Sequence, residues 1–311
     1  MRVVRHLIPG ASPFRTPVVA LGNFDGFHLG HRAIVDRTIA RARASAADAV
    51  VFSFWPHPVA VLAPDRAPPM ITSLSRRLAL LADLALEGVV VRRFTRAFSA
   101  LAPDDFVRDV LVGTLGVSAV VVGYNVTFGH NRTGTPDVLR ELGAALGFAV
   151  EVVPPVLVGG RQVSSSEIRR ELARGDVGGA AGLLGREHFL VGQVRAGDRR
   201  GAALGFPTAN VLPRGGMLPP DGVYAVRVGI DREEPRRPGV ANLGSNPTFG
   251  SVPRRLETHL FDFAGDLYGR RLTVAFVDRL RGELKFPSVE ALREQIRADA
   301  DAARAVLAAK P

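Results

Sequence analysis

Cysteine is absent from all 311 residues of the chain, and lysine occurs only as Lys285 and Lys310. Without cysteine the chain can form no disulfide, no thiolate nucleophile and no cysteine-ligated zinc site. No apolar run approaches the roughly 20 residues that span a bilayer. The N-terminus also lacks the apolar core and cleavage site of a signal peptide. We therefore expect a cytoplasmic protein without a membrane partner.

The net charge of +10 comes almost wholly from arginine and is spread along the chain. A diffuse excess is weaker support for a nucleic-acid groove than a clustered basic stripe, and anionic nucleotide substrates would explain part of it. We therefore expect no nucleic-acid partner. The alternative, a nucleic-acid-binding protein, predicts binding that falls steeply with salt. The oligomeric state cannot be derived from the sequence.

The first half of the chain alternates apolar stretches with helical patterns, which predicts a Rossmann-like parallel sheet with helices on both faces. Ligands bind such sheets at the carboxyl ends of the strands. The predicted strands are 18–21, 49–54, 89–94, 119–122 and 149–153, and the predicted helices are 33–43, 74–86, 105–114 and 136–146.

The most informative segment is 18–32, VVALGNFDGFHLGHR. A buried strand leaves its sheet through the glycine-rich turn 22–26, and a helix follows. A helix N-terminus reached through glycines presents unpaired N–H groups at the positive end of its dipole, which suits phosphate. His28 and His31 add donors that can hold a triphosphate and stabilise charge as pyrophosphate leaves.

Other polar motifs follow later strands of this half. SFWPHP at 53–58 has two prolines that fix a turn around His57. GYNVTFGHNRTG at 123–134 contains Asn125. In SSSEIRR at 164–170, Ser164 can cap a helix, and Arg169 can reach a phosphate from one turn further on.

The string GNFDGFHLGH resembles the (H/T)xGH signature of the nucleotidyltransferase superfamily, and Phe24, Asp25 and Gly26 make it most similar to the flavin-adenylating branch. With the PHP turn, the GxNxxFG loop and the SSSxIR helix, the first half resembles the FMN adenylyltransferase module of bacterial bifunctional riboflavin kinase/FAD synthetases. The resemblance implies that His28 and His31 act on the ATP phosphates. It further implies nucleotide or flavin contacts at Gly22, Phe24, Asp25, Gly26, Gly30, His57, Asn125, Ser164 and Arg169.

After residue 185 the pattern changes to short alternating strands with Gly and Pro turns, so we predict domains at 1–185 and 186–311. Strands at this spacing predict a small antiparallel β-barrel closed by a C-terminal helix at 288–307. The predicted strands are 190–195, 222–228, 238–243, 256–263 and 271–279.

The second half has polar residues suited to phosphoryl transfer. In the turn 205–210, GFPTAN, the oxygens of Thr208 and Asn210 are adequate ligands for hydrated Mg²⁺ beside ATP phosphates. The glycines of 197–201 suit a flap over a nucleotide. Glu257 shares one face of a strand with His259 and can accept the proton of an attacking hydroxyl.

The ordered motifs GFPTANV, PPDGVYAV, GVANLGSNPTFG, LETHLFDFAGDLYG and LRGELKFPS resemble the riboflavin kinase module of the same family. The resemblance implies Mg²⁺ and ATP contacts at Thr208 and Asn210, a nucleotide contact at Gly205, and Glu257 as the base. The implied reactions convert riboflavin and ATP to FMN and ADP, and FMN and ATP to FAD and pyrophosphate. Mg²⁺ is the implied cofactor and ATP the co-substrate.

Four positions depart from the family pattern: Tyr124, Val126, Glu167 and Ala202. The first two motivate an alternative in which only the riboflavin kinase works. The chain has no Walker A string GxxxxGK[ST] and no GxGxxG. We therefore expect neither a P-loop kinase nor a bound redox dinucleotide.

Overall fold

The computed structural model describes residues 1–196, 205–244 and 254–310, and the chain divides into two compact units, Met1–Ser165 and Ser166–Pro311. The predicted flap at 197–201 and the departure at Ala202 lie outside the described residues. The division falls after the first residue of α7 (Ser165–Arg174), which α8 (Val177–Leu184) follows before the barrel begins. The boundary after residue 185 stays a prediction.

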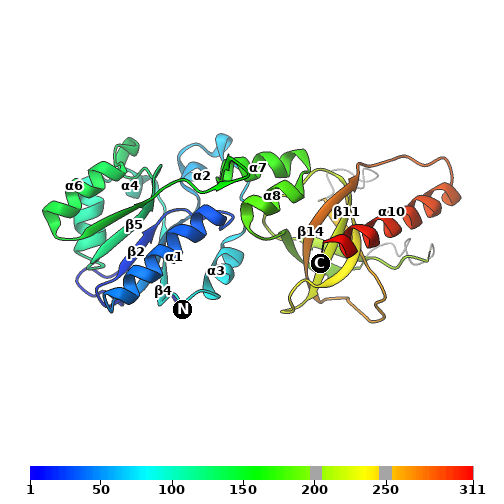
Figure 1. Ribbon diagram of the computed structural model, residues 1–311, viewed down its shortest axis with the longest axis horizontal. Helices are drawn as coiled ribbons and strands as arrows, with labels where there is room; N and C mark the ends of the chain where they lie inside the picture. The colour runs from blue at the N-terminus through cyan, green and yellow to red at the C-terminus, as the bar shows by residue number, and fades with distance from the viewer. Residues whose placement is uncertain (197–204, 245–253, 311) are drawn as a thin grey trace. The chain divides into compact units, whose positions relative to one another are not determined.

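The first unit is built on one six-stranded sheet in which every neighbouring pair runs parallel (Figure 1). In spatial order the strands are β1 (Arg2–Val4), β4 (Gly88–Arg93), β3 (Ala49–Trp55), β2 (Val18–Leu21), β5 (Ala119–Gly123) and β6 (Ala149–Val153). Sequence order reverses between β2 and β5. In doubly wound folds that reversal opens a crevice beyond the strand ends, so it is where a ligand site is expected.

Helices cover both faces of this sheet, because alternate strand residues point to opposite sides. On one face α1 (Leu29–Ala44) and α3 (Leu74–Ala82) contribute Ile34, Val35 and Leu81 to a core with Ala20 and Val51. On the other, α6 (Pro136–Leu146) and the π-helix η2 (Phe106–Val112) pack on the remaining strand residues. The Rossmann-like fold is therefore confirmed.

Several shorter elements complete this unit. They are α2 (Pro58–Leu62), η1 (Pro64–Arg66), α4 (Arg96–Ser99), α5 (Pro103–Asp105), η3 (His130–Arg132) and the hairpin β7 (Leu157–Val158) with β8 (Arg161–Gln162). The helix predicted at 74–86 ends at Ala82, and the one predicted at 105–114 is the short α5 followed by η2. Apolar periodicity marks a buried face but does not distinguish α from π hydrogen bonding.

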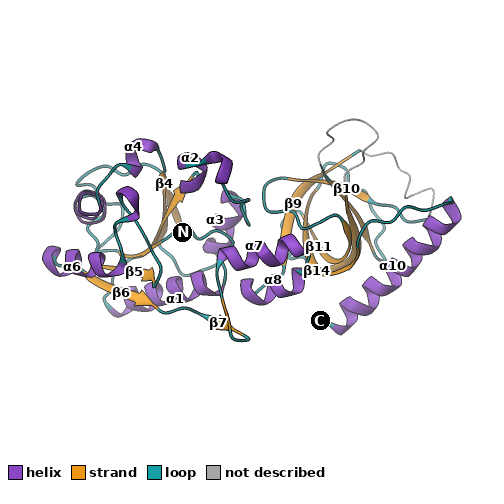
Figure 2. Cartoon of the chain, turned by 90° about the horizontal axis from the view of Figure 1, so that it is seen from above, coloured by secondary structure: helices purple, strands orange, loops and turns teal. Residues whose placement is uncertain are grey.

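The second unit contains a closed barrel of six strands in which all pairs are antiparallel (Figure 2). Around the ring the strands are β10 (Ala209–Pro213), β13 (Arg255–Leu260), β12 (Arg237–Gly244), β11 (Gly222–Ile230), β14 (Arg271–Arg281) and β9 (His188–Arg195). The predicted barrel is confirmed. Its sixth strand, β10, was not predicted, and it begins within the segment 205–210 that the sequence indicated as a turn.

The C-terminal helix α10 (Val289–Ala309) covers the outer face of the barrel over β11, β12 and β14. Ala300, Ala303 and Leu307 pack against Val223 and Ala225. Beside this apolar seam, Arg281 and the buried Asp299 form two parallel hydrogen bonds of 2.9 and 2.7 Å. None of the helices in the described residues is long and apolar enough to cross a bilayer.

Candidate active sites

The glycine turn after β2 lies at the predicted position, beside the reversal of strand order. Gly22 N donates to the carbonyl of Phe52 as the chain leaves the sheet, at 3.1 Å. Phe24 and Gly26 then adopt left-handed backbone with φ of 53° and 82°. A side chain at Gly26 would meet Ile71 at 3.0 Å, so both the conformation and the space favour glycine.

His28 and His31 lie side by side at the N-terminus of α1. His28 is the N-cap, and its Nδ1 accepts the backbone N–H of His31 at 3.2 Å. The two rings are stacked with centroids 3.6 Å apart, and Phe24 meets His31 edge-on at 5.1 Å. Because Nδ1 accepts a hydrogen bond, a neutral His28 carries its proton on Nε2 and can act as a donor there.

Gly30 and the segment around Ser164 lie against this helix start. A side chain at Gly30 would come within 3.2 Å of the His28 ring and 3.7 Å of the Val163 carbonyl. Next to it, Ser165 Oγ donates to the carbonyl of Asp25 at 3.0 Å. The structure thus brings the predicted serine segment beside the glycine turn, although the two are well over a hundred residues apart in sequence.

The remaining predicted residues of this site have separate local settings. His57 is the N-cap of α2, and its Nδ1 accepts from Val59 N at 3.3 Å. Asn125 is exposed just beyond β5, where a side chain at Gly123 would lie 3.6 Å from its Oδ1. Arg169 belongs to α7 in the second unit.

Asp25 has a structural contact that sequence reasoning did not anticipate. It is 2% exposed, and its two carboxylate oxygens accept the N–H groups of Ile71 and Thr72 at 3.0 and 3.1 Å. Its predicted ligand contact stays a prediction. Arg77 is also 2% exposed. The sequence analysis did not identify it as a buried residue, because an arginine in an amphipathic helix ordinarily faces solvent.

In the barrel, strand pairing places three polar side chains in a row. Asn210 on β10 and Asn242 on β12 both lie directly opposite Glu257, on either side of β13. Directly paired residues share a face with Cβ atoms about 4.5–5.5 Å apart. Glu257 and Asn242 are exposed and Asn210 is half-buried, whereas the intervening Thr258 is buried. Asn242 was missed, although alternation along the predicted strand 238–243 gives it a face opposite to its buried neighbours.

His259 on β13 joins the turn 205–208 to that strand. The ring Nδ1 of His259 lies 2.8 Å from the carbonyl oxygen of Pro207, and Phe206 packs edge-on against the ring at 5.6 Å. Gly205 begins the turn with φ of 87°. The predicted shared face of Glu257 and His259 is present, and His259 tethers the residue immediately before Thr208.

Metal binding by Thr208, Asn210 and Glu257 would use two neutral oxygens and one carboxylate. Across the described residues, no cluster of three or more His, Asp or Glu side chains suits a metal ion. Mg²⁺ requires only one or two protein oxygens when phosphate and water supply the rest. The hydroxyl of Thr208 and the amide of Asn210, with Glu257 alongside, are hard oxygen donors and fit that demand.

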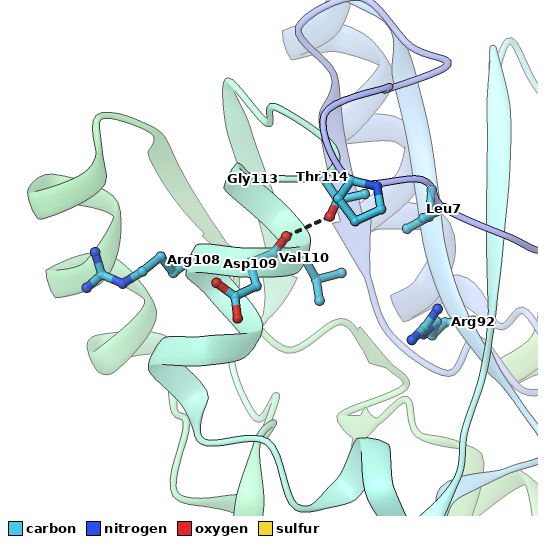
Figure 3. A pocket seen from close by; sticks show the side chains of 8 residues that line it. Leu7, Arg92, Arg108, Asp109, Val110, Gly113 and Thr114 are labelled. Carbon is cyan, nitrogen blue, oxygen red and sulfur yellow. Dashed lines mark hydrogen bonds between the residues drawn. The ribbon is translucent and has the colours of Figure 1, made fainter.

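A separate hollow of about 500 Å³ lies in the first unit near the π-helix (Figure 3). Its lining includes Leu7, Arg92, Arg108, Asp109 and Thr114, and contains none of the predicted site residues. Figure 3 shows Arg108 pointing away from Arg92, so the two arginines do not converge on one point. Thr114 Oγ1 instead donates to the Asp109 carbonyl at 2.7 Å.

Comparison with known proteins finds the same two parts along the chain. The FAD synthetase family model matches residues 12–167, and the riboflavin kinase family model matches residues 184–307. Two bifunctional riboflavin kinase/FMN adenylyltransferases are similar throughout. The protein from Pseudomonas fluorescens is 41% identical, covering 99% of this chain and 98% of its own length; that from Escherichia coli strain K12 is 39% identical, covering 92% and 91%.

A solved structure agrees in fold over almost the whole chain. It is described as a macrolide-efflux protein from Streptococcus pneumoniae, and it is 29% identical with a TM-score of 0.86. The match covers 98% of this chain and 99% of that one. The fold described here is therefore shared by an experimentally determined protein.

Proposed function

The chain belongs to the family of bifunctional riboflavin kinases/FMN adenylyltransferases, and we propose how its own residues carry out the two reactions. It phosphorylates riboflavin with ATP to FMN, and it adenylylates FMN with ATP to FAD and pyrophosphate. The observation that carries this conclusion is the presence of both family models in one chain, with 41% identity to a bifunctional relative over 309 residues. The alternative of a riboflavin kinase alone is not favoured.

In the first unit, the glycine turn and the start of α1 would bind the triphosphate of ATP. A phosphate oxygen of FMN attacks the α-phosphorus, the bond from that phosphorus to the bridging oxygen breaks, and pyrophosphate leaves. His28 can donate from Nε2, and the ring of His31 stacks on it, so both can stabilise the charge that develops on the leaving group. Neither histidine needs to form a covalent bond to substrate.

Ser164, Asn125, His57 and Arg169 would complete the contacts of this site with nucleotide and flavin. The packing of the segment 163–165 against the turn supports the role of Ser164. The position of Asn125 just beyond β5 supports its role, because β5 borders the reversal of strand order.

In the barrel, Glu257 would accept the proton of the riboflavin 5′-hydroxyl as that oxygen attacks the γ-phosphorus of ATP. The strand register supports this role, since it holds Glu257 beside Asn210 on an accessible face. Thr208 and Asn210 would hold Mg²⁺, which supplies charge neutralisation to the ATP phosphates when bound. His259 fixes the turn that carries Thr208, so the ligands and the base are positioned by one strand.

The domains proposed for these reactions are 1–185 and 186–311, and the start of the riboflavin kinase match at residue 184 supports that boundary. The proposed small-molecule partners are riboflavin, FMN, FAD, ATP, ADP and pyrophosphate. We propose a cytoplasmic location, where ATP is the available phosphate donor.

The deciding experiment is a time course of the purified chain with riboflavin, ATP and Mg²⁺, with the flavins separated by chromatography. FMN that appears first and then gives way to FAD is the expected result. FMN that accumulates without FAD would remove the adenylyltransferase from the proposal. Omitting Mg²⁺ should abolish both steps.

A further inference from the structure

The glycine turn at the start of the adenylyltransferase site holds its shape through contacts with another segment of the chain. Phe24 is a non-glycine residue in left-handed backbone, a conformation that persists only where the surroundings fix it. Its side chain is fully buried beneath the turn. The contacts that fix the turn come from residues 71–77, which lead into α3 and form its first part.

Asp25 and Thr72 form the first part of this connection. The Asp25 carboxylate accepts the backbone N–H groups of Ile71 and Thr72, and Thr72 Oγ1 accepts the N–H of Gly26 at 3.2 Å. Asp25 and Thr72 are 2% and 4% exposed. The turn and the segment are therefore joined by reciprocal buried hydrogen bonds.

Arg77 forms the second part, and it joins the ends of two strands. Its Nη1 donates to the carbonyl of Asn23 at 2.6 Å and to Ser53 Oγ at 3.2 Å. Ser53 Oγ in turn donates to the same Asn23 carbonyl at 3.1 Å. Asn23 follows β2 and Ser53 lies on β3, so one guanidinium holds the turn against the neighbouring strand.

A cation at this position is costly, which argues for a function beyond packing. Arg77 is 2% exposed, and its Nε has no hydrogen-bond partner among the described residues. Burial lowers the pKa of Arg77, and the charge of Asp25 opposes that shift. A well-packed apolar residue is often as stable as a buried charge, so stability alone does not explain an arginine here.

We propose that Arg77 is a positioning residue of the adenylyltransferase site, which acts by holding the Asn23 carbonyl and thereby the N–H groups that would face the ATP phosphates. This inference rests on the proposed function of that site. A displacement of about 1 Å in a positioned group can cost about 100-fold in rate. Arg77 contributes without touching substrate, because its hydrogen bonds end on Asn23 and Ser53.

The hydrogen-bond pattern also predicts which replacement is tolerated. Both bonds come from the single atom Nη1, and the fork geometry that distinguishes arginine from lysine is not used. A lysine ammonium keeps the charge and a donor, although its side chain is one atom shorter and it loses the position of the guanidinium over the Trp55 ring, so lysine is the conservative replacement. Arg77→Met keeps the apolar stem and removes the donor and the charge.

The test measures both activities of each purified variant in the full-length chain. For Arg77→Met we expect kcat/KM of FAD formation to fall about 10- to 100-fold with a raised KM for ATP, while riboflavin phosphorylation is unchanged. Arg77→Lys, which keeps the charge and a donor, should recover part of the loss. Leu81→Val, a buried apolar change on the same helix, is the control for lost stability.

The outcomes separate positioning from stability. If Arg77 has only a structural role, kcat should fall in proportion to the unfolded fraction, and the KM for ATP should not change. The loss of FAD formation should then equal that of Leu81→Val when the two variants lose the same amount of melting temperature. That result, or wild-type kinetics in Arg77→Met, overturns the proposal. If Arg77→Met does not fold, Ser53→Ala replaces it, and an unchanged KM for ATP in that variant overturns the proposal. Absence of FAD formation in the wild type would instead refute the proposed function itself.

Discussion

The two candidate sites of this chain are positioned by different means. In the α/β half, the glycine turn lies beyond a strand end and is held by buried side chains, among them Asp25 and Arg77. In the barrel, Asn210 and Glu257 lie within paired strands, and the backbone ladder sets their spacing. A site on a ladder therefore tolerates side-chain changes around it, whereas a site on a turn depends on the contacts that hold the turn.

The largest expected effect is on the barrel site, through Glu257→Ala. A general base contributes about 10²- to 10⁴-fold, so FMN formation should fall by that factor. Because Glu257 is exposed, the melting temperature should barely change. Chromatography of flavins from riboflavin and ATP measures the loss, and FAD formation from supplied FMN is the control. Loss of both activities would contradict the assignment of separate sites.

The next effect tests the turn-based site, through His28→Ala and His31→Ala. Removing a donor to developing charge costs about 10²- to 10³-fold, so FAD formation from FMN should fall that far with riboflavin phosphorylation intact. The two variants should differ in stability. His28→Ala also removes a helix cap, worth about 1 kcal/mol, whereas His31 caps nothing. Equal melting temperatures for the two variants would contradict the capping role of His28.

A smaller effect is expected from Asn242→Ala, which tests whether strand pairing also brings β12 into the barrel site. Asn242→Ala removes the polar residue paired with Glu257 across the ladder, and loss of a substrate contact of about 1 kcal/mol there corresponds to about fivefold in rate. The kcat of riboflavin phosphorylation measures it. Arg237→Ala, at the far end of the same strand, is the matched control and should leave that kcat unchanged. An unchanged kcat in both variants would confine the site to β10 and β13.

The smallest effect concerns the exposed ion pair of Asp262 with Arg304, which joins the barrel to α10. The hydrogen bond from Arg304 lowers the pKa of Asp262 below its usual value of 3.8. The pair therefore stabilises the fold above the unfolded pKa and ceases to do so as the pH falls through the lower folded pKa. Melting temperatures of wild type and Asp262→Asn should differ slightly at pH 7, and the difference should shrink as the pH falls below 3.8. A difference that persists in acid would contradict this.

The sequence predicted the strands and turns better than the contacts between them. The segment 18–32 combines strand, turn and helix signals that depend on neighbours in sequence, and all three formed as predicted. The contacts of Arg77 with Asn23 and of Ser165 with Asp25 join residues 54 and 140 positions apart, which periodicity does not report. Strand β10 was missed because Pro207, just before it, and Asn210, within it, are turn formers, and pairing with β9 and β13 overrides that preference.

The closure of the barrel also sets an order of events in folding. Strand β9 is the first barrel strand to be synthesised, yet it pairs with β14, which is the last. The parallel sheet of the first unit is complete once β6 has emerged, at residue 153. The barrel ring should therefore close last, after translation has passed residue 281.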